Sequence, residues 1–216
     1  MQEALRRYVP DAIAQELASG EGLESGEREV SVLFVDIRGY SSYSEGRAVG
    51  EVFSTINRYT EAVSRVVRKY GGSVVEFNGD GMMAVFGAPR ALEAKEQAAL
   101  EAALELVSSV GQIEVPGEAQ RLSVGVGVAT GAAFVGNIRA VDRMIWSAIG
   151  STTNLAARMQ ALTRPLEAAV VTDPATWSEL ELPPAGFERR REVSIHGLSE
   201  THDLYVLPLS GMEESP

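Results

Sequence analysis

Residues 30–37 read VSVLFVDI, an almost unbroken run of apolar and β-branched side chains that contains one aspartate. Such a run is typical of a strand buried on both faces of a sheet. Over residues 50–70, apolar side chains recur every three or four positions, which predicts an amphipathic helix, and Gly71 and Gly72 end it. The folded part of the chain therefore opens with a buried strand that leads into a helix.

The next segments predict how that strand is paired. Residues 73–78 and 82–87 have the composition of short strands, and only Gly79-Asp80-Gly81 separates them, which is typical of a tight hairpin. The remaining core elements expected are a helix over 91–110 and strands over 122–130 and 132–137, around a glycine at 131. The order strand, helix, strand, strand, helix, strand predicts an α+β fold. Its core is the ferredoxin-like βαββαβ antiparallel sheet with both helices on one face.

Three regions are expected along the chain. Residues 1–28 combine a short helical pattern with a Gly/Glu/Ser-rich linker, and residues 29–208 form the folded domain. C-terminal additions to the core are expected as a helix over 151–162 and strands over 168–172, 190–195 and 204–207. Residues 209–216 are expected to be a disordered tail.

Composition excludes several classes of function. The chain has 216 residues, of which 45% are apolar, and its 19 basic and 30 acidic side chains give a formal net charge of −11. This balance argues against a nucleic acid or an anionic membrane surface as the partner. The absence of cysteine excludes disulfides and thiolate chemistry. No apolar run has the roughly 18–20 residues that a membrane-spanning helix needs, so we expect a cytoplasmic protein.

Two carboxylates are predicted to meet at one edge of the sheet. Asp36 lies at the end of the first strand, and Asp80 lies in the hairpin that leads to the third. The first and third strands of a ferredoxin-like sheet are neighbours, so these side chains come together beside glycines. Two such acids repel each other unless a cation joins them, and hard oxygen ligands suit Mg²⁺ or Mn²⁺ carrying a polyphosphate. Taken alone, Asp36 is equally compatible with capping the turn that follows it.

A second pair of polar residues lies on the expected helix over 151–162. Asn154 and Arg158 are four positions apart, so they project from one face of that helix. An amide and a guanidinium on one edge are able to hold a ribose and a developing phosphorane charge. The alternative is an ordinary solvated helix face.

Three segments, taken in order, resemble the signature motifs of class III nucleotide cyclases, the catalytic domains of adenylate and guanylate cyclases. They are VLFVDIRGYSSYSE, VVEFNGDGMMAVFGAP and VGNIRAVDRMIWSAIGSTTNLAARMQ. The resemblance extends over about residues 30–207 and implies the class III cyclase fold, with residues 29–208 as the catalytic domain. The leader RRYVPDAIAQEL is similar to the segment that joins such domains to upstream sensor modules, so a sensor module is a possible partner.

The resemblance assigns roles to single residues. It implies that Asp36, Asp80 and the carbonyl of Ile37 hold two divalent cations, Mg²⁺ or Mn²⁺. It also implies that Asn154 positions the ribose and Arg158 stabilises the transition state, in sites shared across a homodimer. The backbone amides expected to contact the triphosphate are those of Arg38, Gly39, Tyr40 and Ser41. The segment at 194–200, SIHGLSE, stands where family members often carry lysines that meet the terminal phosphates.

Two positions bear on the choice of nucleotide. Glu76 stands where adenylate cyclases usually carry lysine, and Ser147 stands where they usually carry aspartate or threonine. A carboxylate accepts from both N1–H and N2–H₂ of guanine, and a serine hydroxyl donates to O6. These residues predict conversion of GTP to cyclic GMP and pyrophosphate. An adenylate cyclase that uses ATP remains the alternative, as does a non-catalytic regulatory domain that binds nucleotide.

Overall fold

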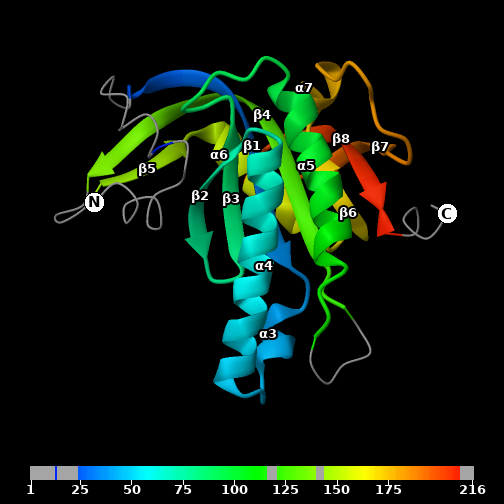
Figure 1. The fold of residues 1–216 in the computed structure, drawn as a ribbon. Helices are drawn as coiled ribbons and strands as arrows, with labels where there is room; N and C mark the ends of the chain where they lie inside the picture. The colour runs from blue at the N-terminus through cyan, green and yellow to red at the C-terminus, as the bar shows by residue number, and fades with distance from the viewer. Residues whose placement is uncertain (1–12, 14–23, 116–120, 140–143, 210–216) are drawn as a thin grey trace.

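The apolar run at residues 30–37 forms the inner part of β1 (Gly26–Ile37), the strand at the centre of the fold. The computed structural model describes residue 13 and residues 24–115, 121–139 and 144–209. In these residues β1 pairs antiparallel with both β3 (Gly81–Phe86) and β4 (Val124–Arg139). The strand order is β2-β3-β1-β4-β6-β8-β7, and β5 pairs with β4 outside this path (Figure 1).

The other strands are β2 (Ser73–Asn78), β5 (Met144–Ile149), β6 (Ala168–Thr172), β7 (Glu188–Ser194) and β8 (Thr201–Pro208). The helices are α3 (Tyr40–Ser44), α4 (Val49–Lys69), α5 (Lys95–Val110), α6 (Ser151–Leu162) and α7 (Pro174–Ser178). The predicted ferredoxin-like core is confirmed, because β2, β3, β1 and β4 are neighbours in that order and all antiparallel. The predicted bounds of β2, α6 and β6 are those observed.

The structure corrects the predicted sheet mainly in three places, and the ends of β3, β7 and β8 also differ from the predicted bounds. Instead of two strands around Gly131, β4 is one strand of 16 residues, and Gly131 pairs with Val30 inside it. All twelve residues of β1 pair with β4, and this pairing keeps Gly131 in the ladder, although glycine alone weakens a strand. The strand β1 begins at Gly26, four residues earlier than predicted. The added strand β6 is parallel to β4, so the complete sheet is mixed.

The helices differ from the prediction at their ends and in number. The helix α5 begins at Lys95, because residues 91–94 are used to cross from β3 to the helical layer. The sequence did not predict the short helices α3 and α7 or the strand β5. Of the N-terminal helix expected within residues 1–28, only the helical and buried Ile13 is described, and residues 210–216 of the expected tail also lie outside the described residues.

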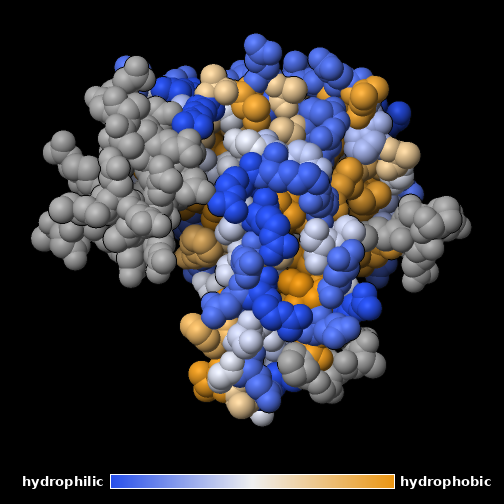
Figure 2. Space-filling view, in the orientation of Figure 1, coloured by the Kyte–Doolittle hydropathy of each residue, from blue (hydrophilic) through white to orange (hydrophobic). Residues whose placement is uncertain are grey.

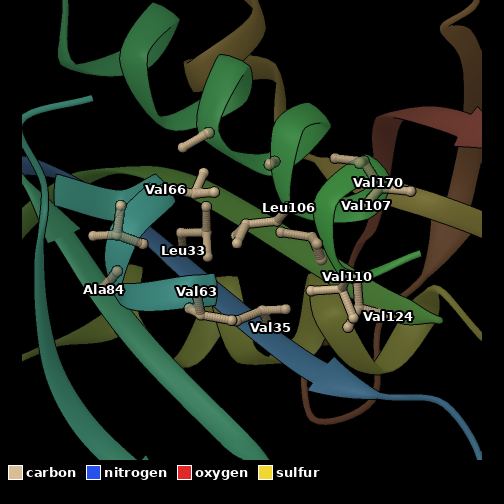
Figure 3. Close-up of a cluster of buried hydrophobic side chains, with 14 of the residues drawn as sticks. Leu33, Val35, Val63, Val66, Ala84, Leu106, Val107, Val110, Val124 and Val170 are labelled. Atoms are coloured by element: carbon tan, nitrogen blue, oxygen red, sulfur yellow. The ribbon is translucent and has the colours of Figure 1, made fainter. Parts of the chain in front are cut away.

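The main core lies between the sheet and the two helices α4 and α5, which cover one face (Figure 1). Leu33 and Val35 of β1 meet Val63 of α4 and Leu106 of α5 in this layer (Figure 3). Each fully buried side chain of this size contributes about 1.5–3 kcal/mol through the hydrophobic effect. The outer side of α4 is hydrophilic along most of the helix (Figure 2), and Val49 and Phe53 near its N-terminus are exposed apolar side chains. Successive side chains of a strand point to opposite faces of the sheet, and in β1 Leu33, Val35 and Ile37 point into this core.

The opposite face of the sheet carries α6, which packs closely against β4 (Figure 1). A Cβ atom on Gly127 would lie 2.1 Å from the amide nitrogen of Gln160, and one on Gly125 would lie 2.2 Å from Oγ1 of Thr163. Side chains at these two positions would separate helix and strand. Asp36 pairs with Gly125 in the β1–β4 ladder. Two glycines of β4 thus bring the end of α6 beside the end of β1.

Candidate active site

Asp36 and Asp80 come together at one edge of the sheet, as the sequence predicts. Asp36 is the eleventh of twelve residues in β1, and Asp80 lies in the turn between β2 and β3. Because Val35 pairs with Met82, the end of β1 lies beside that turn. Burial, a hydrogen bond with Asp80 and the charge of Asp80 together raise the pKa of Asp36 from 3.8 to about 7. Two half-buried carboxyl groups here compete for one proton.

The surroundings of Asp36 fit a cation. Its Oδ1 atom is buried and has no hydrogen-bond partner within the described residues. An unpartnered buried carboxylate oxygen beside a second carboxylate is an unfavourable arrangement that a hard cation would relieve. The Ile37 side chain is buried in the main core, so only its backbone is available to a ligand at this edge. Within the described residues, no cluster of three or more His, Cys, Asp or Glu side chains occurs. The donor set is therefore two carboxylates with backbone oxygen.

These carboxylates open into a cavity of about 190 Å³ that is lined by residues of β1, β2 and β3, by Asp80 in the turn and by one residue of α6. Glu76 lines the same cavity, so one of the two residues predicted to contact the base lies near Asp36 and Asp80 within one chain. The lining residues are Phe34, Val35, Asp36, Glu76, Asn78, Asp80, Gly81, Met82, Met83 and Gln160. The Glu76 side chain is exposed, at an irregularity in the β2–β3 pairing.

Gln160 of α6 also lines the cavity, and the sequence analysis did not single it out. A signal was present, because Ala156, Met159 and Thr163 mark the buried stripe of α6 and Gln160 lies within that stripe. A polar residue on the buried side of an amphipathic helix is a candidate for contact with a polar site.

Three other predicted side chains do not line this cavity. Asn154 is exposed near the start of α6, and Ser147 is buried in β5, where it pairs with Gly136. Arg158 is half-buried, and a Cβ atom on Gly197 would lie 3.1 Å from its Nη2 atom. The guanidinium therefore lies against the SIHGLSE segment. Of the residues described, Asn154, Arg158 and Ser147 are not among those that line the cavity.

The segment after β1 begins with a tight turn. Gly39 adopts a left-handed conformation, with φ of 69°, and caps the N-terminus of the short helix α3. The amides of Tyr40 and Ser41 are in the first turn of that helix, where backbone donors have no partner within the helix. The amide of Arg38 donates to the carbonyl of Ser123 at 2.8 Å. A contact between triphosphate and amide thus stays a prediction for Gly39, Tyr40 and Ser41, whereas the Arg38 amide is already bonded within the protein.

Comparison with known proteins decides the family. Residues 24–208 match the family described as the adenylate and guanylate cyclase catalytic domain. The chain belongs to this family. The match covers both the carboxylate edge and α6, and the resemblance seen in the sequence is confirmed.

Relatives and solved structures agree with this assignment. Adenylate cyclase 1 of Rhizobium meliloti is 30% identical over 182 residues, which are 78% of this chain and 26% of that protein. A bacterial light-regulated adenylyl cyclase superposes with a TM-score of 0.81 at 26% identity, over 95% of this chain and 60% of that one. The adenylyl cyclase CyaB from P. aeruginosa gives a TM-score of 0.75 at 27% identity, over 86% and 96% of the two chains.

Two further findings concern the extent of the match and the character of the helices. The chain spans about a quarter of the length of the Rhizobium relative that it matches. Among the described helices, none combines the length and the apolar character required to cross a membrane.

Proposed function

We propose that this cyclase domain converts ATP to 3′,5′-cyclic AMP and pyrophosphate in sites shared between the two chains of a homodimer. The observation that carries the proposal is the Asp36–Asp80 pair with its unpartnered buried oxygen, in a chain that matches the cyclase family over residues 24–208. In the reaction the ribose 3′-oxygen forms a bond with the α-phosphorus, and the bond from that phosphorus to pyrophosphate breaks. The 3′-hydroxyl proton is released.

Asp36 and Asp80, with the Ile37 carbonyl, would hold two divalent cations. Such cations polarise the phosphate oxygens and lower the pKa of a bound hydroxyl. The protein's own contribution is to keep both carboxylates at one edge in a half-buried setting, where charge interactions are stronger than in water. The amides of Gly39, Tyr40 and Ser41 would donate to the triphosphate, as donors at the beginning of a helix do.

Asn154 and Arg158 would act on the nucleotide held by the partner chain. Asn154 is exposed on α6, so its amide is free to reach across an interface to a ribose. Arg158 would donate to the charge that develops on the α-phosphate. Neither residue lines the cavity at Asp36 and Asp80 of its own chain, which favours a site completed by a second copy.

ATP is the proposed substrate because two relatives with a functional name, the Rhizobium protein and a protein of Anabaena cylindrica, are adenylate cyclases. Adenine offers an amino donor at N6 and an acceptor at N1. The Glu76 carboxylate would accept from N6, and the Ser147 hydroxyl would donate to N1. These two residues are thus compatible with ATP even though the family's usual lysine is missing.

GTP is the second candidate, and Glu76 favours it. Its carboxylate lines the cavity and is exposed, so it is available to accept from both N1–H and N2–H₂ of guanine. With ATP, the same carboxylate accepts from only one of the two groups on the Watson–Crick edge. The choice between the two purines therefore depends on a measured rate.

The test compares the two nucleotides side by side. Purified protein is incubated with ATP, with GTP and with an equimolar mixture, in Mg²⁺ and separately in Mn²⁺, and the products are identified by mass. The expected result is cyclic AMP at a higher kcat/KM than cyclic GMP, and the reverse order would replace the proposal with the GTP candidate. Nucleotide binding without either product would favour the non-catalytic regulatory domain.

A further inference from the structure

The side chain of Arg38 connects the carboxylate edge to α6. Its Nε donates to the carbonyl of Val124 at 3.2 Å, and its Nη2 donates to the carbonyl of Thr163 at 3.2 Å. Nη2 also donates to the carbonyl of Ala168. These three acceptors belong to the start of β4, to the C-terminal cap of α6 and to the start of β6. One guanidinium therefore holds three elements at the point where β1 ends.

In the part of the chain that the structure describes, the half-buried guanidinium of Arg38 is held by backbone carbonyls and not by a carboxylate. Arg38 is half-buried, and among the described residues no carboxylate lies within ion-pair distance of it. Its partners are neutral carbonyls, and one of them is the cap of a helix, where orphan carbonyls and the helix dipole favour a cation. A buried charge is costly unless its donors are satisfied, so this bonding pattern holds the guanidinium in one place.

The turn that Arg38 holds needs such support. The amide of Ala168 donates to the carbonyl of Thr163 at 2.9 Å, so these two acceptors of Arg38 are the two ends of the turn from α6 to β6. Within that turn Glu167 has a φ of 49°, a conformation that is rare for residues other than glycine. Strained residues persist where the surrounding structure fixes them. The hydrogen bonds from Arg38 to Thr163 and Ala168 help to hold this turn.

We propose that Arg38 is a positioning residue that sets the place of α6, and hence of Asn154 and Arg158, relative to Asp36. Arg38 is two residues from Asp36 along the chain, and Thr163 is five residues from Arg158 on a helix packed directly against β4. A shift at the C-terminal cap of a helix moves the side chains along it. The inference rests on the proposed function, because it assigns Arg38 to both halves of a shared site.

In a homodimer the consequence extends across the interface. The Asp36 of one chain would serve one active site, whereas the Asn154 and Arg158 of the same chain would serve the other. Arg38 would therefore fix how the two sites of the dimer are placed relative to each other. It does this without touching the nucleotide through its side chain.

The first experiment compares Arg38→Met with Arg28→Met. Arg28 is the matched control, because it is also a half-buried arginine that donates to a backbone carbonyl, that of Pro89 at 2.9 Å. It lies near the start of β1, whereas Arg38 follows the last residue of that strand, and it also forms a weak ion pair with Glu24 at 3.9 Å. For Arg38→Met we expect a kcat about 10- to 100-fold lower, since small misplacements of reacting groups have effects of this size. The KM for nucleotide should change less than about threefold, because the backbone amides are unaltered. Arg28→Met should leave both values near those of the unmodified protein.

A second readout does not depend on turnover. Amide hydrogen exchange in residues 159–168 should become faster in Arg38→Met and not in Arg28→Met, because local opening of α6 is easier without the three hydrogen bonds. Arg38→Lys keeps the charge but loses the planar fork, so it should give intermediate exchange and kcat values. Unchanged exchange in this segment, or an equal loss of kcat in both methionine variants, would overturn the inference. If Arg38→Met does not fold, Arg38→Lys gives the same comparison.

Mixed dimers separate the effect of Arg38 on α6 from its effect on the carboxylate edge of the same chain. When an Asp80→Asn chain pairs with an Arg158→Ala chain, the one intact site takes its carboxylates from the second chain and its α6 from the first. Arg38→Met added to the Asp80→Asn chain should still lower the activity, because it displaces the α6 that this site uses. Full activity of that mixture would contradict the inference. Failure of the parent mixture to recover activity would instead contradict the shared site, and the exchange measurement would still test Arg38.

Discussion

The candidate site has two halves, the carboxylate edge with Asp36 and Asp80 and the α6 half with Asn154 and Arg158. Their electrostatic environments differ. At the carboxylate edge, Asp36 has a raised pKa and a buried oxygen without a partner, so the folded chain holds an unfavourable arrangement there. On α6, Asn154 is exposed and Arg158 lies half-buried against Gly197, and neither residue has a positive φ. The carboxylate edge is therefore electrostatically unfavourable within a single chain, which is what a cation-binding site without its cation would look like. The other half is an ordinary helix until a second molecule is placed against it.

The comparison also explains where a cation matters in a chain with a net charge of −11. A nucleoside triphosphate is itself strongly negative, so an acidic protein binds it only where the local sign is inverted. In the proposed function, Asp36 and Asp80 would perform that inversion at one edge by recruiting divalent cations. On α6 the positive charge is built in as Arg158 and needs no metal.

The largest expected effect comes from breaking each half separately. Asp80→Asn and Arg158→Ala should each lower kcat at least about 100-fold, since each removes charge stabilisation of the transition state. A mixture of the two should regain activity. If chains pair at random, half of the dimers are mixed and each has one intact site of two, which gives about a quarter of the unmodified activity.

The measurement is a cyclase assay on separate and mixed variants that carry different affinity tags, so that mixed dimers are isolated and counted. Asp203→Asn is the matched control, because this carboxylate is bonded to Arg189 on the β7–β8 ribbon, away from the candidate site. Mixed dimers that form but remain inactive would show that the two halves do not serve one shared site.

A smaller effect is expected from changing the residues predicted to contact the base. Glu76→Lys combined with Ser147→Asp should raise the ratio of kcat/KM for ATP to that for GTP by roughly tenfold or more, because the donors and acceptors at these positions would then be mismatched to guanine. Both nucleotides are assayed under the same metal conditions. Each single variant is measured as well, since Glu76 lines the cavity and Ser147 lies on a different strand. A ratio that stays constant would mean that these positions do not contact the base.

The carboxylate edge was predictable from sequence because it depends on local patterns. A buried strand ending near Asp36 and a glycine hairpin at Asp80 suffice to predict that they meet, once strand order is known. The role of the Arg38 side chain was not predictable, because its acceptors lie 86, 125 and 130 positions further along the chain. The continuity of β4 through Gly131 was missed for a related reason. Pairing with β1 overrides the local tendency of glycine to interrupt a strand.

The smallest expected effect is on thermal stability. It is measured in protein kept free of divalent cations with a chelator, and it tests the repulsion between Asp36 and Asp80. Asp36 has a folded-state pKa of about 7 against 3.8 for the unperturbed group. Between these values the folded chain holds a proton that the unfolded chain has released, so the free energy of unfolding decreases as pH rises through this window. Asp80→Asn removes the charge that opposes ionisation of Asp36. We therefore expect the variant to melt a few degrees above the unmodified protein at pH 8, with a smaller difference at pH 5. Thermal unfolding followed by circular dichroism measures both.

Adding Mn²⁺ should reverse that order at pH 8. The unmodified protein keeps both carboxylates, so cation binding to the folded state should raise its melting temperature, whereas Asp80→Asn has lost one ligand and should gain less. Arg158→Ala serves as the control on α6, and its melting temperature should respond to Mn²⁺ as the unmodified protein does. If the melting temperature of Asp80→Asn stayed equal to that of the unmodified protein at every pH, with and without Mn²⁺, the carboxylate edge would carry no stored repulsion. The contrast between the two halves would then have to be explained by geometry alone.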